Sequence, residues 1–334
     1  MKVDRHRAVE VATDAFRAHG ISEADARQTA EVLVSADARG KHSHGLLRLP
    51  RFVRGINHGN VDPEGTIEVV AERGGAATIS GGSRLGPAVA SAAAGEAMDR
   101  AEEFGVGAVG VHDSNHLGML GYYTDQLLQE GFVGIGITNT EPAMPPYGGT
   151  EPVLGTNPIA IGLPTDPAFN LDMSTSGIAR GTVLHYQETG QQLPEGVALD
   201  AEGQPTTDPE AALDGTILPF GGTKGSGLAI AVEVLAGGLV GAAMGTDVTG
   251  TYHTEDPCTK GDLFLAIDPE ALGVPDFGQQ ASAFLADLTE GQPAAHVDGI
   301  RLPGQRSTQR DLTVTRVEIE DDLWTEVQSL AAKS

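Results

Sequence analysis

The sequence is poor in cysteine and aromatic residues and has no long uninterrupted apolar run. Cys258 is the only cysteine among 334 residues, so no disulfide can form within the chain. No apolar run reaches the roughly 18 residues that a membrane-spanning helix needs, and the charged, amphipathic N-terminus is not typical of a signal peptide. We therefore expect a cytoplasmic protein that does not contact a membrane.

Positive charge is also scarce. Lys and Arg number 21 against 46 Asp and Glu, which gives a net charge of −25, and only five of the cations are lysines. Such a field repels nucleic acid and anionic membranes. It is typical of a chain adapted to a salty cytoplasm, as in a halophile. An anionic substrate would need cations supplied locally, so each lysine and each clustered arginine is worth examining.

The periodicity predicts a mixed fold of helices and strands. Residues 4–19 and 23–39 are expected to be helices, the second capped by Ser22 and ended by Gly40. Strands and further helices, the latter expected over 86–104 and 117–129, then follow one another without the regular alternation of a doubly wound sheet. We therefore expect an α/β or α+β fold, in which the N-terminal helices pack on a C-terminal helix from about Asp321 to form a discontinuous domain.

One stretch matches a dinucleotide-binding fingerprint by its letters alone. Gly105, Gly107 and Gly110 have the right spacing, but a helix is predicted before them and a strand through them. The fingerprint needs a helix N-terminus at the glycines, so that free N–H groups can meet a pyrophosphate. The stretch is thus predicted to be a closely packed strand, and a cofactor site, if present, would not be a Rossmann site.

A second glycine-rich stretch, residues 220–228, is a better candidate for an anion site. Its glycines and Lys224 stand just before an apolar helix expected over 224–244, where N–H groups, the helix dipole and an ammonium could meet an anion. The alternative is a helix entry that is rich in glycine for close packing. The rarity of lysine favours the anion site.

The segment 39–50 concentrates groups that suit a small organic acid. Arg48 is the best candidate for a carboxylate clamp, since guanidinium binds carboxylate in a bidentate fork, and Ser43 and His44 can add hydrogen bonds. Arg51 could serve a second acidic group, which favours a dicarboxylate. Arg54 is better explained as part of a basic helical face that pairs with surface acids.

Two more histidines, His112 and His116, flank Asp113 at the end of a predicted buried strand. Their spacing could hold a metal on a helix, but a loop is expected here and no third ligand or cysteine is near. We therefore expect no metal, and favour general acid–base chemistry over two structural histidines. A metal-dependent hydrolase built on His42, His44, His112 and His116 stays an alternative.

With these residues in view, the chain resembles the type 2 malate/L-lactate dehydrogenase family, a non-Rossmann NAD(P)-dependent group. The matching stretches keep their order across nearly the whole chain, so the resemblance is specific. They are RGKHSHG (39–45), RLPR (48–51), SNHLG (114–118), GYY (121–123), EPVLGTNP (151–158), LDMSTS (171–176), LPFGGTKGSGL (218–228) and LPG (302–304).

The resemblance implies a non-Rossmann sheet domain that holds the cofactor, over residues 63–299. It also implies a discontinuous helical domain, residues 1–62 with 300–334, and a homodimer or higher homo-oligomer. His116 matches the family's acid–base histidine. The residues that match its substrate side are Ser43, His44 and Arg48. The residues that match its cofactor contacts, for NAD or NADP, are Asp172, Ser174, Thr175, Ser176, Lys224, Gly304 and Arg306.

The chain departs from the family pattern at two positions. Gln305 stands where an acid is common, which puts that cofactor contact in doubt, and Phe52 stands where tyrosine often sits, which removes a hydroxyl. The pair Thr140 and Glu141 is variable in the family and is expected to tune substrate choice.

The expected activity is hydride transfer between a nicotinamide cofactor and a small L-2-hydroxy acid of the malate, lactate or sulfolactate type. The alternatives on the same scaffold are a reductase of cyclic imino acids and a dehydrogenase of the ureidoglycolate type. A non-catalytic binding protein that kept the fold is also open. The choice between NAD and NADP is not readable, because the acidic-residue rule belongs to the absent Rossmann fingerprint.

Overall fold

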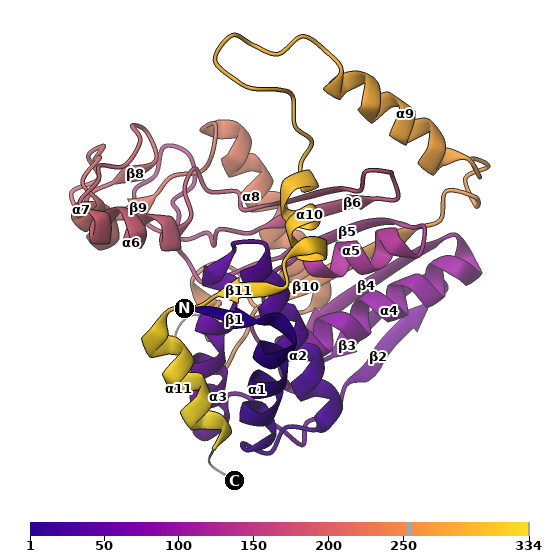
Figure 1. Ribbon diagram of the computed structural model, residues 1–334, viewed down its shortest axis with the longest axis horizontal. Coiled ribbons are helices and arrows are strands. Elements are labelled where there is room, and N and C mark those ends of the chain that lie inside the picture. The colour runs from indigo at the N-terminus through magenta and orange to yellow at the C-terminus, as the bar shows by residue number, and fades with distance from the viewer. Residues whose placement is uncertain (252–255, 333–334) are drawn as a thin grey trace.

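The computed structural model describes residues 1–251 and 256–332 (Figure 1). Within these residues the largest sheet has seven strands in the order β2-β3-β4-β10-β5-β6-β7, and of its neighbouring pairs only β3–β4 is parallel. The strands are β2 Glu68–Arg73, β3 Ala76–Ser80, β4 Val106–His112, β5 Val133–Thr138, β6 Ile159–Leu163, β7 Phe169–Met173 and β10 Asp262–Ile267. The predicted mixed, non-Rossmann fold is confirmed.

Helices cover both faces of this sheet. One face carries α4 (Gly86–Phe104) and α5 (Gly121–Gln129), and the other carries α8 (Thr223–Ala236) and η3 (Gly238–Val240). The predicted strand of glycines is β4, which is therefore no dinucleotide fingerprint. Gly107 faces α4, where a Cβ would overlap the carbonyl oxygen of Ala97, and Gly110 faces Val240 on the other side. Small residues thus let helices approach both faces of a central strand, as the low aromatic content requires.

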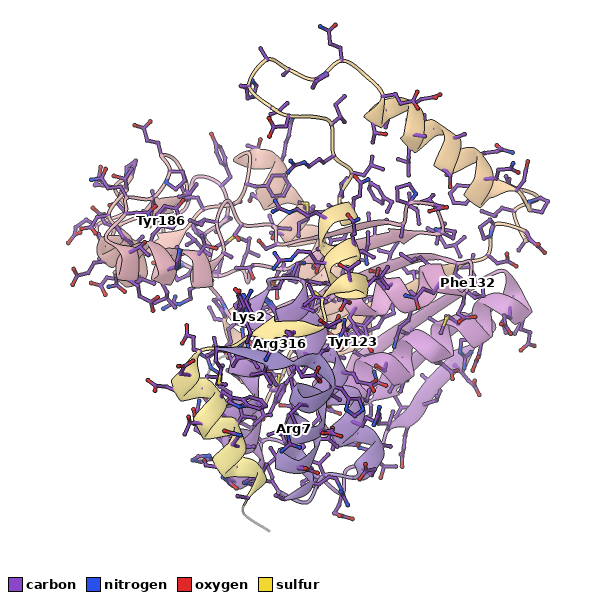
Figure 2. The ribbon with its side chains drawn as sticks, in the orientation of Figure 1. Lys2, Arg7, Tyr123, Phe132, Tyr186 and Arg316 are labelled. Atoms are coloured by element: carbon purple, nitrogen blue, oxygen red, sulfur yellow. The ribbon has the colours of Figure 1, made fainter. Side chains whose placement is uncertain are left out.

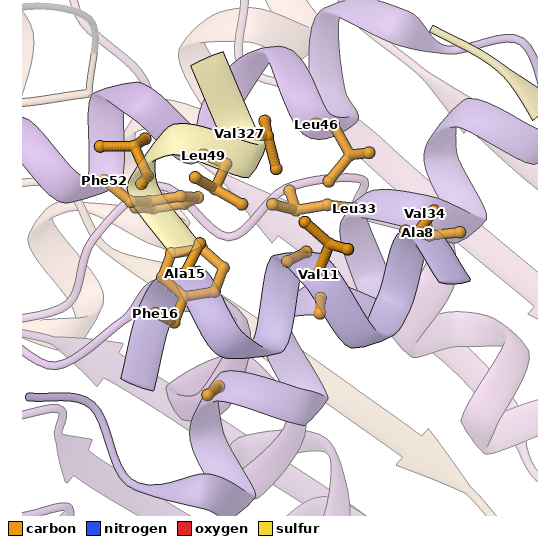
Figure 3. Close-up of a cluster of buried hydrophobic side chains, with 14 of the residues drawn as sticks. Ala8, Val11, Ala15, Phe16, Leu33, Val34, Leu46, Leu49, Phe52 and Val327 are labelled. Atoms are coloured by element: carbon orange, nitrogen blue, oxygen red, sulfur yellow. The ribbon is translucent and has the colours of Figure 1, made fainter. Parts of the chain in front are cut away.

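Segments from both ends of the chain form a helical unit beside the sheet. Strands β1 and β11 pair antiparallel, and Lys2 and Arg316 lie along this ribbon (Figure 2). One buried cluster includes Phe16, Leu33 and Val327 (Figure 3). The elements are β1 Lys2–Asp4, α1 Arg5–Arg17, α2 Glu23–Ala38, η1 His42–His44, η2 Leu46–Arg48, α3 Leu49–His58, β11 Arg316–Glu318 and α11 Asp321–Ala331. The exact domain boundaries stay a prediction.

A smaller lobe and a C-terminal arm complete the molecule. The lobe has its own apolar cluster, to which Tyr186 contributes, and stands to one side of the sheet (Figures 1 and 2). Helix α9 extends away from the body near the turn between β6 and β7, and α10 returns the chain to β7 and α2 (Figure 1). The elements are α6 Arg180–Thr189, β8 Ala198–Leu199, α7 Pro209–Asp214, β9 Thr216–Ile217, η4 Gly245–Asp247, α9 Phe277–Thr289 and α10 Gln305–Thr313.

A buried arginine joins the helical unit to the sheet. Arg39, at the end of α2, pairs with Asp125 of α5 at 2.5 Å and with Asp311 of α10 at 2.8 Å. The hydroxyl of Ser35 also donates to Asp311, at 2.6 Å. These contacts bring α2, α5 and α10 together.

Two predicted helices differ from the structure. The helix expected from Leu117 begins at Gly121, and the residues before it form a loop. The helix expected over 224–244 ends at Ala236, where Gly237 caps it.

Among the described residues, the stretch Thr223–Val240 is long and apolar enough to span a membrane, with a mean hydropathy of 1.3. Within this structure 44% of the stretch is buried. One face of α8 packs on the sheet while Ile230 and Val234 on the other are 45% and 52% exposed, so the helix is not enclosed by this chain. A helix that covers a sheet passes the same test of composition.

The close approach of α4 to β4 yields a paired prediction. Gly107→Ala should lower the free energy of unfolding by about 1–3 kcal/mol, because the added methyl group forces α4 and β4 apart. The control is Gly95→Ala in α4, where a Cβ meets nothing within 4 Å. Alanine is favoured over glycine in a helix, so this change should stabilise the protein by about 0.5–1 kcal/mol. Urea unfolding of both variants measures the difference, and equal stabilities would contradict the packing.

Candidate active site

A cleft of about 540 Å³ lies where five segments meet, and its volume suits a small molecule or part of a cofactor. The segments are 40–48 of the helical unit, 116–120 after β4, 138–143 after β5, 172–176 at the end of β7, and 179–182 at the start of α6; the third brings Thr140 and Glu141 into the lining. Most of the residues singled out from the sequence line it. They are Ser43, His44, Arg48, His116, Asp172, Ser174 and Ser176.

The loop that carries Ser43, His44 and Arg48 is shaped by the buried carboxylate of Asp37. It accepts the backbone N–H of Leu46 at 2.8 Å and meets the His42 Nδ1 at 2.9 Å. Gly45 lies against this carboxylate, where a Cβ would overlap both of its oxygens. Burial raises the pKa of Asp37, although both hydrogen bonds oppose the shift. One acidic side chain in α2 thus holds the loop over the cleft.

Arg48 and Ser43 are held in turn by short-range contacts. Arg48 Nε donates to the carbonyl oxygen of Ser43 at 2.8 Å, which orients the guanidinium plane. The hydroxyl of Ser43 lies 2.9 Å from His44 Nδ1. The three predicted substrate-side residues therefore form one connected group on the cleft wall, as a carboxylate clamp requires.

His116 faces this group from the loop after β4. Its Nδ1 accepts the backbone N–H of Gly118 at 3.0 Å, so the proton of the neutral ring is on Nε2. Its ring lies 5.8 Å from that of His44, centroid to centroid. The loop is fixed from both sides. Asn115 Nδ2 donates to the carbonyl oxygens of Ser83 and Arg84 at 2.9 and 3.0 Å. The hydroxyl of the buried Tyr123, labelled in Figure 2, donates to the backbone carbonyl oxygen of Leu117.

Both histidines stay neutral around pH 7. Burial, and next to it the positive charge of Arg48, lower the pKa of His44 to about 4, with Asp172 opposing. Burial again, followed by Arg48, His44, Lys260 and Arg51, lowers the pKa of His116 well below its ordinary value. A second proton on either ring would add a charge to a place that is already positive and poorly hydrated.

Two lysines that the sequence analysis had not placed in the site lie in the cleft wall. Lys41 forms an ion pair with Asp172, which joins the helical unit to the end of β7. Lys260 is buried and binds both oxygens of Asp262 at 2.6 Å. The scarcity of lysine was the available signal, but nothing local shows which lysine a fold will bury.

The predicted cofactor residues differ in whether they line the cleft. Ser174 Oγ lies 2.8 Å from Ser176 Oγ in the cleft wall, whereas Thr175 is buried and donates to the carbonyl oxygen of Thr156 at 2.9 Å. Three others lie outside the residues that line the cleft. They are Lys224, which is exposed, Gly304, whose φ of +79° begins α10, and Arg306, which is exposed. The cofactor role of all of these residues stays a prediction.

The structure offers no support for the metal-dependent alternative. In the part of the chain that is described, no group of three or more His, Cys, Asp or Glu could hold a metal. His42 is directed to Asp37, and His112 pairs at 2.8 Å with Asp113, which is exposed. Two of the four histidines that this hydrolase needs, His42 and His112, are therefore each paired with a different carboxylate.

A non-Rossmann sheet with a cleft that combines an oriented arginine and neutral, proton-carrying histidines defines an enzyme acting on small organic acids. The sequence matches the model of the malate/L-lactate dehydrogenase family over residues 3–328. The chain belongs to this family, and the predicted class, an NAD(P)-dependent oxidoreductase of 2-hydroxy acids, is confirmed.

Similar proteins include several archaeal members. The chain is 46% identical to L-sulfolactate dehydrogenase of Methanothermobacter thermautotrophicus over 290 residues, 86% of this chain and 85% of that one. It is also 46% identical to malate/(S)-sulfolactate dehydrogenase of Methanothermus fervidus, over 82% and 81% of the two chains. The solved sulfolactate dehydrogenase of Methanocaldococcus jannaschii matches with a TM-score of 0.94 and 40% identity, over 99% of this chain and 96% of that one.

The charges around the two histidines predict an unusual titration. In an NMR titration of the ring carbons, His44 should protonate at about pH 4, and His116 well below 6.5, its ordinary value. Arg48→Met removes a repelling cation, so the pKa of both rings should rise. A His116 that titrates near 6.5 in the unaltered protein would contradict the electrostatics described above.

Proposed function

We propose that this enzyme interconverts a 2-oxo acid and an L-2-hydroxy acid that carries a second acidic group, as in malate or sulfolactate. The observation that carries the proposal is the gathering of cations around His116 in a chain of net charge −25. Arg48, Lys260 and Arg51 all act on its pKa. The relatives named for malate and sulfolactate support the same substrate class.

The chain's own residues account for binding and proton exchange. Arg48, oriented through its Nε, binds the carboxylate next to C2, and Ser43 and His44 border the same group. His116 Nε2 faces the C2 oxygen and supplies the proton that the alcohol needs. The bound nicotinamide supplies or accepts the hydride. Holding both reactants in one cleft removes much of the entropic barrier.

The protonation state of His116 favours reduction. A neutral ring with its proton on Nε2 donates a hydrogen bond to a carbonyl oxygen and polarises it, as neutral histidines do in other enzymes. The bond from Gly118 to Nδ1 keeps this tautomer in place. We infer that the resting enzyme is ready to receive a 2-oxo acid.

The cleft residues fit a nicotinamide dinucleotide, NAD or NADP. The hydroxyls of Ser174 and Ser176 can bind ribose or phosphate oxygens, and Arg180 adds a cation to the lining of the cleft. We propose that these residues and Asp172 border the cofactor, while Ser43, His44 and Arg48 border the substrate. Lys224, Gly304 and Arg306 would then serve parts of the cofactor that extend beyond the cleft.

The activity can be tested by the absorbance of reduced nicotinamide at high salt. NADH and NADPH are each combined with sulfopyruvate, oxaloacetate, pyruvate and piperideine-2-carboxylate. Sulfopyruvate or oxaloacetate should exceed pyruvate in kcat/KM by roughly tenfold or more, since one added charge contact is worth about 1.4 kcal/mol. Pyruvate or the cyclic imino acid as the best substrate would contradict the proposed second acidic group.

His116→Ala should lower kcat of the same reaction by about 10²–10⁴-fold, the usual contribution of a proton-transfer group. Cofactor affinity, measured by fluorescence of the reduced nicotinamide, should be retained. His112→Ala is the matched control, because that ring pairs with an exposed carboxylate. Unaltered turnover in His116→Ala would show that His116 is not the proton-transfer residue.

We also infer a homodimer or larger homo-oligomer that covers the outer face of α8. Ile230, Val234 and Leu235 of α8 and Leu239 of the following η3 are exposed by 45%, 52%, 41% and 65%, in a chain whose net charge is −25. An apolar stripe of this kind on a soluble protein is typical of an interface between subunits.

The double change Ile230→Glu/Val234→Glu should convert the assembly to monomers in sedimentation velocity. Leu312→Glu, at an 81% exposed position of α10, should leave it intact. A wild-type monomer at micromolar concentration would overturn the inference.

The net charge supports a further inference about the setting. We propose that the protein works in a salty cytoplasm, where a dense carboxylate surface holds water and ions and short screening lengths weaken its self-repulsion. Assays at molar salt are therefore the appropriate starting condition.

A further inference from the structure

Lys260 is a charged side chain enclosed by protein. It is 1% exposed, and its partner Asp262, at the start of the central strand β10, is fully buried. The Nζ donates to both Asp262 oxygens at 2.6 Å. This engages two of the three N–H groups of the ammonium.

Stability of the core does not explain this pair. Removing two charges from water costs several kcal/mol for each, and apolar residues of similar size are often as stabilising as a buried ion pair. The neighbours along β10, Phe264 and Ala266, are apolar and buried. An ion pair at this position therefore calls for a reason other than packing.

The position of Lys260 supplies that reason. It lines the same cleft as His116, together with Thr138 and Thr251. The segment that carries it is fixed, because Gly261 N–H donates to Asn139 Oδ1 at 2.8 Å and its carbonyl oxygen accepts Thr138 Oγ1 at 3.1 Å. The positive charge also acts on His116, whose pKa it lowers. Arg48, in contrast, reaches the cleft from the helical unit.

We propose that Lys260 is a second catalytic residue, whose ammonium contacts the C2 oxygen beside His116, and that Asp262 is a positioning residue that holds it there. In reduction, the hydride forms the new C–H bond at C2 and the π electrons of the carbonyl move to its oxygen. His116 Nε2 then gives that oxygen its proton, and the imidazolate that this leaves is stabilised by the charges of Lys260 and Arg48 until Nε2 takes a proton from solvent. Lys260 stays protonated throughout and stabilises the negative charge on the oxygen.

This inference rests on the proposed function, and three variants test it. Lys260→Met alone leaves Asp262 as a buried, unpaired charge and can prevent folding. Lys260→Met/Asp262→Asn removes both charges together, so it should fold with a Tm close to that of the wild type. Arg100→Met/Glu96→Gln removes a partly buried ion pair of α4 outside the cleft and is the matched control.

The Lys260→Met/Asp262→Asn enzyme should lose about 10²–10³-fold in kcat, the usual effect of removing a donor to a developing oxyanion. The loss should be the same for pyruvate and for oxaloacetate, because both share the C2 oxygen, and KM should change little. The pKa of His116, followed by NMR, should rise. The control should keep kcat within about twofold.

Two results would overturn the assignment. A folded Lys260→Met/Asp262→Asn protein with wild-type kcat would make the ion pair structural. A loss confined to KM for oxaloacetate or sulfopyruvate would place Lys260 at the second acidic group. If the wild type turns over no acid of the panel, the proposed function fails instead. The NMR titration then still shows whether Lys260 acts on His116.

Discussion

The cleft depends on the buried guanidinium of Arg39. It stands at the end of α2 and pairs with Asp125 of α5 and Asp311 of α10, so three segments that are distant in sequence must meet at one cation. Two carboxylates satisfy its charge and raise its pKa against the effect of burial. Losing Arg39 would leave the buried carboxylate of Asp125 without its cationic partner, which is far costlier than a rearrangement at the surface. The wall with Arg48 is thereby held against the wall with His116.

Electrostatics inside the cleft oppose those of the whole molecule. The surface is strongly acidic, yet the residues that act on His116 are Arg48, His44, Lys260 and Arg51. A substrate anion thus meets long-range repulsion and short-range attraction. High salt screens the first over distances beyond the Debye length and leaves the second largely intact, because the site is partly buried. Burial, and next to it the same local charge, keeps the histidines neutral, which suits them for hydrogen bonding to an oxygen rather than for carrying charge.

Much of the fold and part of the site could be predicted because their determinants are local. Ser22 caps α2, as its position before the helical pattern predicts, and α4 spans Gly86–Phe104 as expected. The glycines of β4 were correctly predicted to serve packing. The end of α8 was wrong, since apolar residues continue past Ala236 and only the backbone of Gly237 ends the helix. The early start predicted for α5 was wrong too, because Leu117 faces the core from a loop and not from a helix.

What the sequence by itself determined is therefore the set of elements, the clustering of Ser43, His44 and Arg48, and the candidacy of His116, since each rests on neighbours within a few residues. Only the tertiary structure decided which lysines join them. Lys41 meets Asp172 across 131 positions, and Lys260 enters the cleft because β10 is inserted between β4 and β5. Contacts between distant residues depend on how the elements pack, and no local pattern of charge or hydrophobicity encodes that choice.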